Sequence, residues 1–119
     1  MTGFATLDPE ALATLRALDQ DNPGAFSQFV RMFVSEAPDL VRRLEAAVAS
    51  NDEAARGQAA HYLRSASLAL GATELAEICH ALEHPSHPLT AADGQELLGR
   101  LRHGARDALL ALLSHVRQI

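Results

Sequence analysis

The chain has 119 residues, 48% of them hydrophobic and 21% charged, which is enough for one compact domain over residues 1–119 and too few for a second. Ala and Leu supply 42 residues whereas Val and Ile supply seven, so good helix formers dominate and folds built on β-sheets are disfavoured. The formal net charge of −5 comes from 15 acidic residues and ten basic ones, all of them Arg, which disfavours nucleic-acid binding.

The first half of the chain predicts two helices. Asp8 can cap a short helix over residues 8–18, with Pro9 at its first helical position. After a turn rich in Asp, Asn, Pro and Gly, apolar residues recur every three or four positions, which predicts a long helix over residues 23–49. Pro38 lies inside this second segment, so we expect a kink or a brief interruption there.

The second half predicts three more helices, over residues 52–70, 72–84 and 90–117. Turn and capping residues precede the first of these, and Gly71 can end it. Pro85 and Pro88 end the next one, and Thr90 can cap the last. Four long amphipathic helices with short connections predict an all-α, antiparallel (up-down-up-down) four-helix bundle, with the short extra N-terminal helix covering one end.

The helix over residues 52–70 has an unusual outward face. At 100° per residue its apolar stripe points to the core, and His61 lies at the middle of the opposite side. Close to His61 on that side are two small residues, Gly57 and Ser65, one cation, Arg64, and one apolar residue, Leu68. Small neighbours and an exposed Leu are typical of a surface where another protein docks.

This face also suits one kind of chemistry. A neutral imidazole can accept a phosphoryl group on a ring nitrogen, and a guanidinium one turn away can reach the new oxygens. The small residues on either side leave room for the active site of another protein. The pattern therefore predicts phosphorylation of His61, stabilised by Arg64.

The sequence around His61 resembles the signature of histidine-containing phosphotransfer (HPt) domains, roughly A-H-x-L-K-[GS]-[SA]-[SA]-x-x-L-G-A followed by L, C and L-E. The residues that carry the resemblance are Ala60-His61-Tyr62-Leu63-Arg64-Ser65-Ala66-Ser67-Leu68-Ala69-Leu70-Gly71-Ala72, then Leu75, Cys79 and Leu82-Glu83. The preceding Phe-rich segment is also similar to these domains, so the resemblance covers nearly the whole chain. Two positions depart from the pattern, because Arg64 replaces the usual Lys and Ala69 stands where the family often has Asn.

The resemblance implies that His61 is the phospho-acceptor, that Arg64 stabilises the phosphoryl group and that Ser65 is the small residue beside them. The chain would be a phosphocarrier rather than an enzyme, taking the phosphoryl group from a receiver-domain aspartate and passing it to another receiver in two-component signal transduction. Its partners would be response-regulator receiver domains or a hybrid sensor kinase. It would need no cofactor or metal of its own, because the receiver supplies Mg²⁺, and we expect a monomer.

Two alternatives remain open. The same face could serve a non-phosphorylated interaction module that binds a receiver or another regulator. A metal site could form from His80, His84 and His87, although such sites usually have further fixed ligands.

The single Cys79 lies on an apolar stripe, which predicts a buried, unreactive thiol.

Nothing near the N-terminus resembles the basic and then apolar layout of a signal peptide, and no apolar run approaches the ~20 residues that cross a bilayer. We therefore expect a cytoplasmic protein without direct membrane contact.

Overall fold

The computed structural model describes residues 7–117, with side chains as far as His115, and this part of the chain contains five helices and no strand. The helices are α1 (Pro9–Asp21), α2 (Ala25–Ala49), α3 (Glu53–Leu70), α4 (Thr73–Glu83) and α5 (Ala91–Arg117). None of the helices in residues 7–117 is long and apolar enough to span a membrane. The predicted all-α fold is confirmed.

Polar side chains begin three of the helices as the sequence predicts. Asp8 accepts a hydrogen bond from the Glu10 N–H at the start of α1, and Asp52 accepts one from the Ala55 N–H at the start of α3. Thr90 Oγ1 accepts from an N–H in the first turn of α5. Each contact satisfies a backbone donor that has no partner within its helix.

One bound of the expected helices is wrong, and of the kink or interruption expected at Pro38 the interruption is absent. The first helix continues past residue 18 to Asp21, because the chain turns later, where the Asp19 side chain accepts a hydrogen bond from the Phe26 N–H. Helix α2 runs without interruption through Pro38. Proline removes only one helical hydrogen bond, and the buried residues on both sides of it, such as Phe33 and Leu44, hold the two halves of α2 against the same core.

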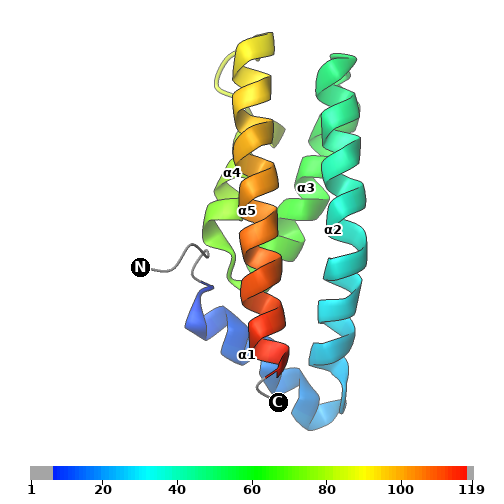
Figure 1. Cartoon of the computed structure of the whole chain (residues 1–119), viewed down its shortest axis with the longest axis vertical. Helices are drawn as coiled ribbons and strands as arrows, with labels where there is room; N and C mark the ends of the chain where they lie inside the picture. Colours follow the sequence, from blue (N-terminus) through cyan, green and yellow to red (C-terminus); the bar gives the residue numbers. More distant parts are fainter. Residues whose placement is uncertain (1–6, 118–119) are drawn as a thin grey trace.

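Helices α2 to α5 form a bundle in which each helix has two neighbours (Figure 1). Helix α2 packs against α3 and α5, and α4 packs against the same two helices from the other side. In Figure 1 the chain rises along α2 and descends along α5, so these two helices are antiparallel. Helix α1 lies across the lower end, where it packs against α2 and α3.

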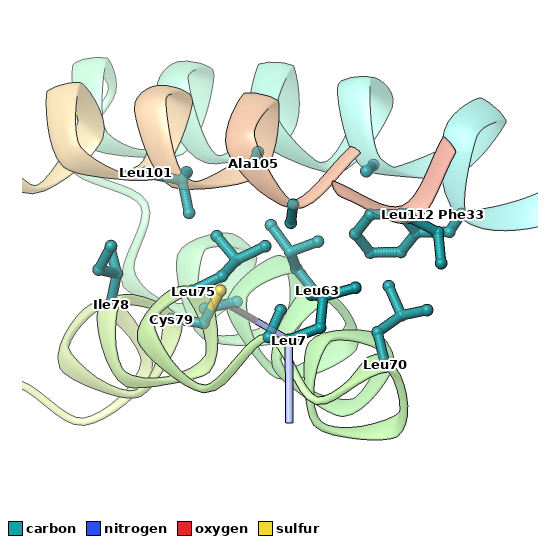
Figure 2. Packing of buried hydrophobic residues seen from close by; sticks show 14 of the residues in the cluster. Leu7, Phe33, Leu63, Leu70, Leu75, Ile78, Cys79, Leu101, Ala105 and Leu112 are labelled. Atoms are coloured by element: carbon teal, nitrogen blue, oxygen red, sulfur yellow. The ribbon is translucent and has the colours of Figure 1, made fainter. Parts of the chain in front are cut away.

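The core consists of apolar side chains from every helix. Figure 2 shows Phe33 of α2 and Leu112 of α5 close to Leu63 and Leu70 of α3. These four residues are at most 4% exposed. Burying a Leu or Phe side chain contributes about 2 kcal/mol each, so this apolar layer fixes which face of α3 is left for the solvent.

Cys79 belongs to this core and should be unreactive in the folded protein. It is fully buried, and burial, followed by the negative charge of nearby Glu83, raises the pKa of its thiol from 9.0 to about 12. The thiolate fraction at neutral pH is then about a thousandfold below that of an ordinary cysteine. A colorimetric thiol reagent at pH 8 should modify Cys79 only after the protein is unfolded in denaturant. Equal rates for native and unfolded protein would contradict this expectation.

Candidate functional site

His61 lies on the outer face of α3. Its side chain is 60% exposed, whereas Leu63 and Leu70 on the opposite face are completely buried. The predicted exposure of His61 is therefore confirmed. It follows from helical periodicity, since the core takes one stripe of α3 and His61 is about half a turn away from it.

Among residues 7–115, the imidazole of His61 contacts one side chain, which comes from another helix. Its Nδ1 lies 2.9 Å from Oε2 of Glu83, the last residue of α4. An ionised carboxylate only accepts hydrogen bonds, so the proton of the neutral imidazole belongs on Nδ1. Nε2 then carries a free lone pair and can act as a nucleophile.

Arg64 completes this group from the next turn of α3. Its Nη1 lies 3.8 Å from Oε1 of Glu83, which is an ion-pair distance but too long for a hydrogen bond. Oε1 is buried and has no hydrogen-bond partner in the part of the chain that the structure describes. The guanidinium is therefore held near His61 by charge while its donors remain available for another anion.

Glu83 is held in place by the packing of α4 on α3. Its side chain is only 12% exposed. Beside it, the buried Arg56 of α3 donates from Nε to the Leu82 carbonyl at 2.9 Å, which ties the end of α4 to α3. A cation at that end also stabilises the negative end of the helix dipole.

The three other predicted residues share the outward face of α3 with His61. Ser65 is exposed, Leu68 is 50% exposed, and Gly57 is half-buried with no atom within 4 Å of the position that a Cβ would take. Nothing in residues 7–115 covers them closely. The docking role that the sequence suggests for these residues stays a prediction.

A groove that the sequence did not indicate lies beside this face, between α2 and α3. Tyr62, which follows His61 and is 69% exposed, stands at its edge with the half-exposed Met32. The groove has a volume of about 340 Å³ and is lined by Phe29, Met32, Phe33, Glu36, Ala37, Leu40, Arg43, Tyr62, Leu63 and Ala66. Its apolar lining extends the exposed surface from His61 toward α2.

The three histidines considered for a metal site are not assembled into one. The rings of His80 and His84 lie 5.4 Å apart, but His84 contacts Glu83 and His87 contacts Asp93. Within the described part of the chain, no three His, Cys, Asp or Glu residues are grouped closely enough to hold a metal ion.

The chain is therefore a small helical bundle that exposes His61 beside a cation, Arg64, and a carboxylate, Glu83. The family model of the Hpt domain matches residues 28–119, so the chain belongs to the Hpt domain family. This family carries out phosphotransfer in two-component systems. Its members are phosphocarriers rather than enzymes, and they typically interact with receiver domains. A search of curated proteins gives no match.

Proposed function

We propose that His61 is the residue of this chain that carries the phosphoryl group. The observation that supports this most is the hydrogen bond between its Nδ1 and Glu83, at 2.9 Å, together with the exposure of the ring. The carboxylate selects the tautomer whose Nε2 is unprotonated, and because the side chain is 60% exposed an acyl phosphate of a partner can approach it.

The proposed reaction is an in-line displacement at phosphorus. Nε2 of His61 forms a bond to the phosphorus of a receiver aspartyl phosphate, and the bond between phosphorus and the aspartate oxygen breaks. The receiver recovers its carboxylate, and His61 keeps its proton on Nδ1. In the next step the aspartate of a second receiver attacks the phosphorus, and the bond from phosphorus to His61 Nε2 breaks. His61 is therefore the nucleophile in the first transfer and the leaving group in the second.

Charges on both sides of His61 suit this reaction. The imidazole gains positive charge as Nε2 bonds to phosphorus, and Glu83 on Nδ1 stabilises that charge. Arg64 can donate to the phosphoryl oxygens with groups that Glu83 leaves unoccupied. The chain would need no metal or cofactor of its own, since the Mg²⁺ that neutralises the acyl phosphate would belong to the receiver.

The outward face of α3 is the proposed receiver-binding surface. Leu68 offers apolar contact, and Gly57 and Ser65 leave room for the loops around the aspartate of the receiver. A receiver domain, free or within a hybrid sensor kinase, is the proposed partner.

The test is phosphoryl transfer from a panel of phosphorylated receivers, with Mg²⁺, to the native chain and to His61→Gln. Label on the native chain alone supports the proposal. Binding of a receiver without any label on the native chain would favour a non-phosphorylated interaction module instead.

A further inference from the structure

Arg56 of α3 is a buried cation without an acidic partner. The residue is only 8% exposed. Burying a charge is costly unless the charge is paired. Yet no Asp or Glu in the described part of the chain forms an ion pair with Arg56. Its positive charge is therefore not neutralised by the protein.

Most hydrogen-bond donors of Arg56 are also free. A guanidinium has five N–H donors, and Arg56 uses one of them, from Nε to the Leu82 carbonyl at 2.9 Å. Among residues 7–115, Nη1 and Nη2 make no hydrogen bond, and neither is completely sealed from solvent, since the buried side-chain atom without a partner is Glu83 Oε1. The four donors on Nη1 and Nη2 are therefore open to a ligand.

Arg56 lines a pocket of about 300 Å³ where α2 ends and α5 begins. This is the end of the bundle away from α1 (Figure 1). The pocket has room for an oxyanion together with several waters. Its lining contains no acidic residue that would repel an anion, and consists of Val48, Ala49, Asn51, Arg56, Leu89, Thr90 and Ala91.

The start of α5 gives this pocket a second source of donors. Thr90 and Ala91 both line it, and the N–H of Ala91 has no acceptor within its own helix because it belongs to the first turn. The N-terminus of a 27-residue helix also carries a partial positive charge. A buried arginine and a helix N-terminus therefore meet at one cavity, and both favour an anion.

We propose that this pocket binds a phosphate group, held by Nη1 and Nη2 of Arg56 and by the first N–H groups of α5. The two Nη atoms match two oxygens of an oxyanion, and a tetrahedral phosphate has further oxygens for the helix N-terminus. Arg56 lies five positions before His61, which turns it about 140° away around α3. The site is therefore separate from the His61 face and does not rest on the proposed function.

The test is a titration of the unphosphorylated chain with inorganic phosphate, at an ionic strength held constant with NaCl, followed by ¹H–¹⁵N NMR. We expect saturable shifts of the Ala91 amide and of the Arg56 Nε–H. Arg56→Met has a similar volume but no guanidinium, so its affinity should be roughly tenfold lower or less. Arg31→Met is the matched control, because Arg31 is exposed on α2, and it should bind as the native chain does.

A parallel titration with methyl phosphate identifies the source of the phosphate group. Tighter binding of methyl phosphate than of inorganic phosphate would assign the pocket to a phosphate monoester, and weaker binding would assign it to the free ion.

A second variant keeps the test decisive if Arg56→Met does not fold. Ala91→Pro retains Arg56 and removes one N–H at the first helical position, where proline is well tolerated. It should weaken phosphate binding by roughly three- to tenfold. The proposal would be overturned by the absence of saturable shifts in the native chain, by native affinity in either variant, or by shifts confined to the His61 face, where Arg64 is the cation.

Discussion

Replacing His61 with Gln should abolish phosphoryl acceptance from every receiver that labels the native chain. Gln keeps a polar side chain of similar length, so the exposed surface of α3 and its helix are preserved. Its amide nitrogen has no free lone pair comparable to that of imidazole Nε2, and the reaction loses its nucleophile. The measurement is transfer of labelled phosphate, with the acid lability and alkali stability that distinguish phosphohistidine from other phosphorylated residues.

The control for this substitution is another exposed histidine. His103 on α5 is exposed and lies outside the His61 group, so His103→Gln should accept label at the native rate. Label that persists on His61→Gln would show that another residue is the acceptor.

Replacing Gly71 with Ala should destabilise the fold more than the same change at Gly24. Gly71 ends α3 with φ +77°, and a Cβ there would lie 2.7–2.8 Å from backbone atoms of Asp8. Asp8 also donates its N–H to the Gly71 carbonyl at 2.7 Å, so the two segments cannot separate without losing that bond. We expect a loss of about 2–4 kcal/mol in the free energy of unfolding, measured by urea titration.

Gly24 provides the matched comparison for Gly71. It also has a positive φ, +89°, but a Cβ there would meet no atom within 4 Å. Gly24→Ala should therefore cost only the backbone strain, about 1 kcal/mol. Equal losses for the two variants would show that the contact with Asp8 is not what requires glycine at position 71.

Much of the fold follows from local sequence. Caps at Asp8, Asp52 and Thr90, together with apolar periodicity, predict helix positions because these effects act within a few residues. Helix α1 ends at Asp21, beyond its predicted end, because the Asp19 side chain closes the following turn by accepting a hydrogen bond from the Phe26 N–H, seven residues away. No interruption forms at Pro38, because packing on both sides of it outweighs one missing hydrogen bond.

The candidate site can also be predicted only in part from the sequence. The exposure of His61 and its neighbours on α3 follows from helix geometry alone. The contact of Glu83 with His61 could not be derived from periodicity, because it depends on the register between α3 and α4; only its place in the family signature singled Glu83 out. Arg56, which joins α3 to the end of α4 by donating to the Leu82 carbonyl, has no local sequence signal.

The most direct test of the account is to find which nitrogen of His61 carries the phosphoryl group. The chain, labelled with ¹⁵N-histidine and phosphorylated by a receiver, would be examined by NMR for coupling between ³¹P and the ring nitrogens. Because Glu83 holds Nδ1 at 2.9 Å, we predict that the phosphoryl group is on Nε2 of His61. Attachment at Nδ1, or at a histidine other than His61, would contradict the proposed role of this site.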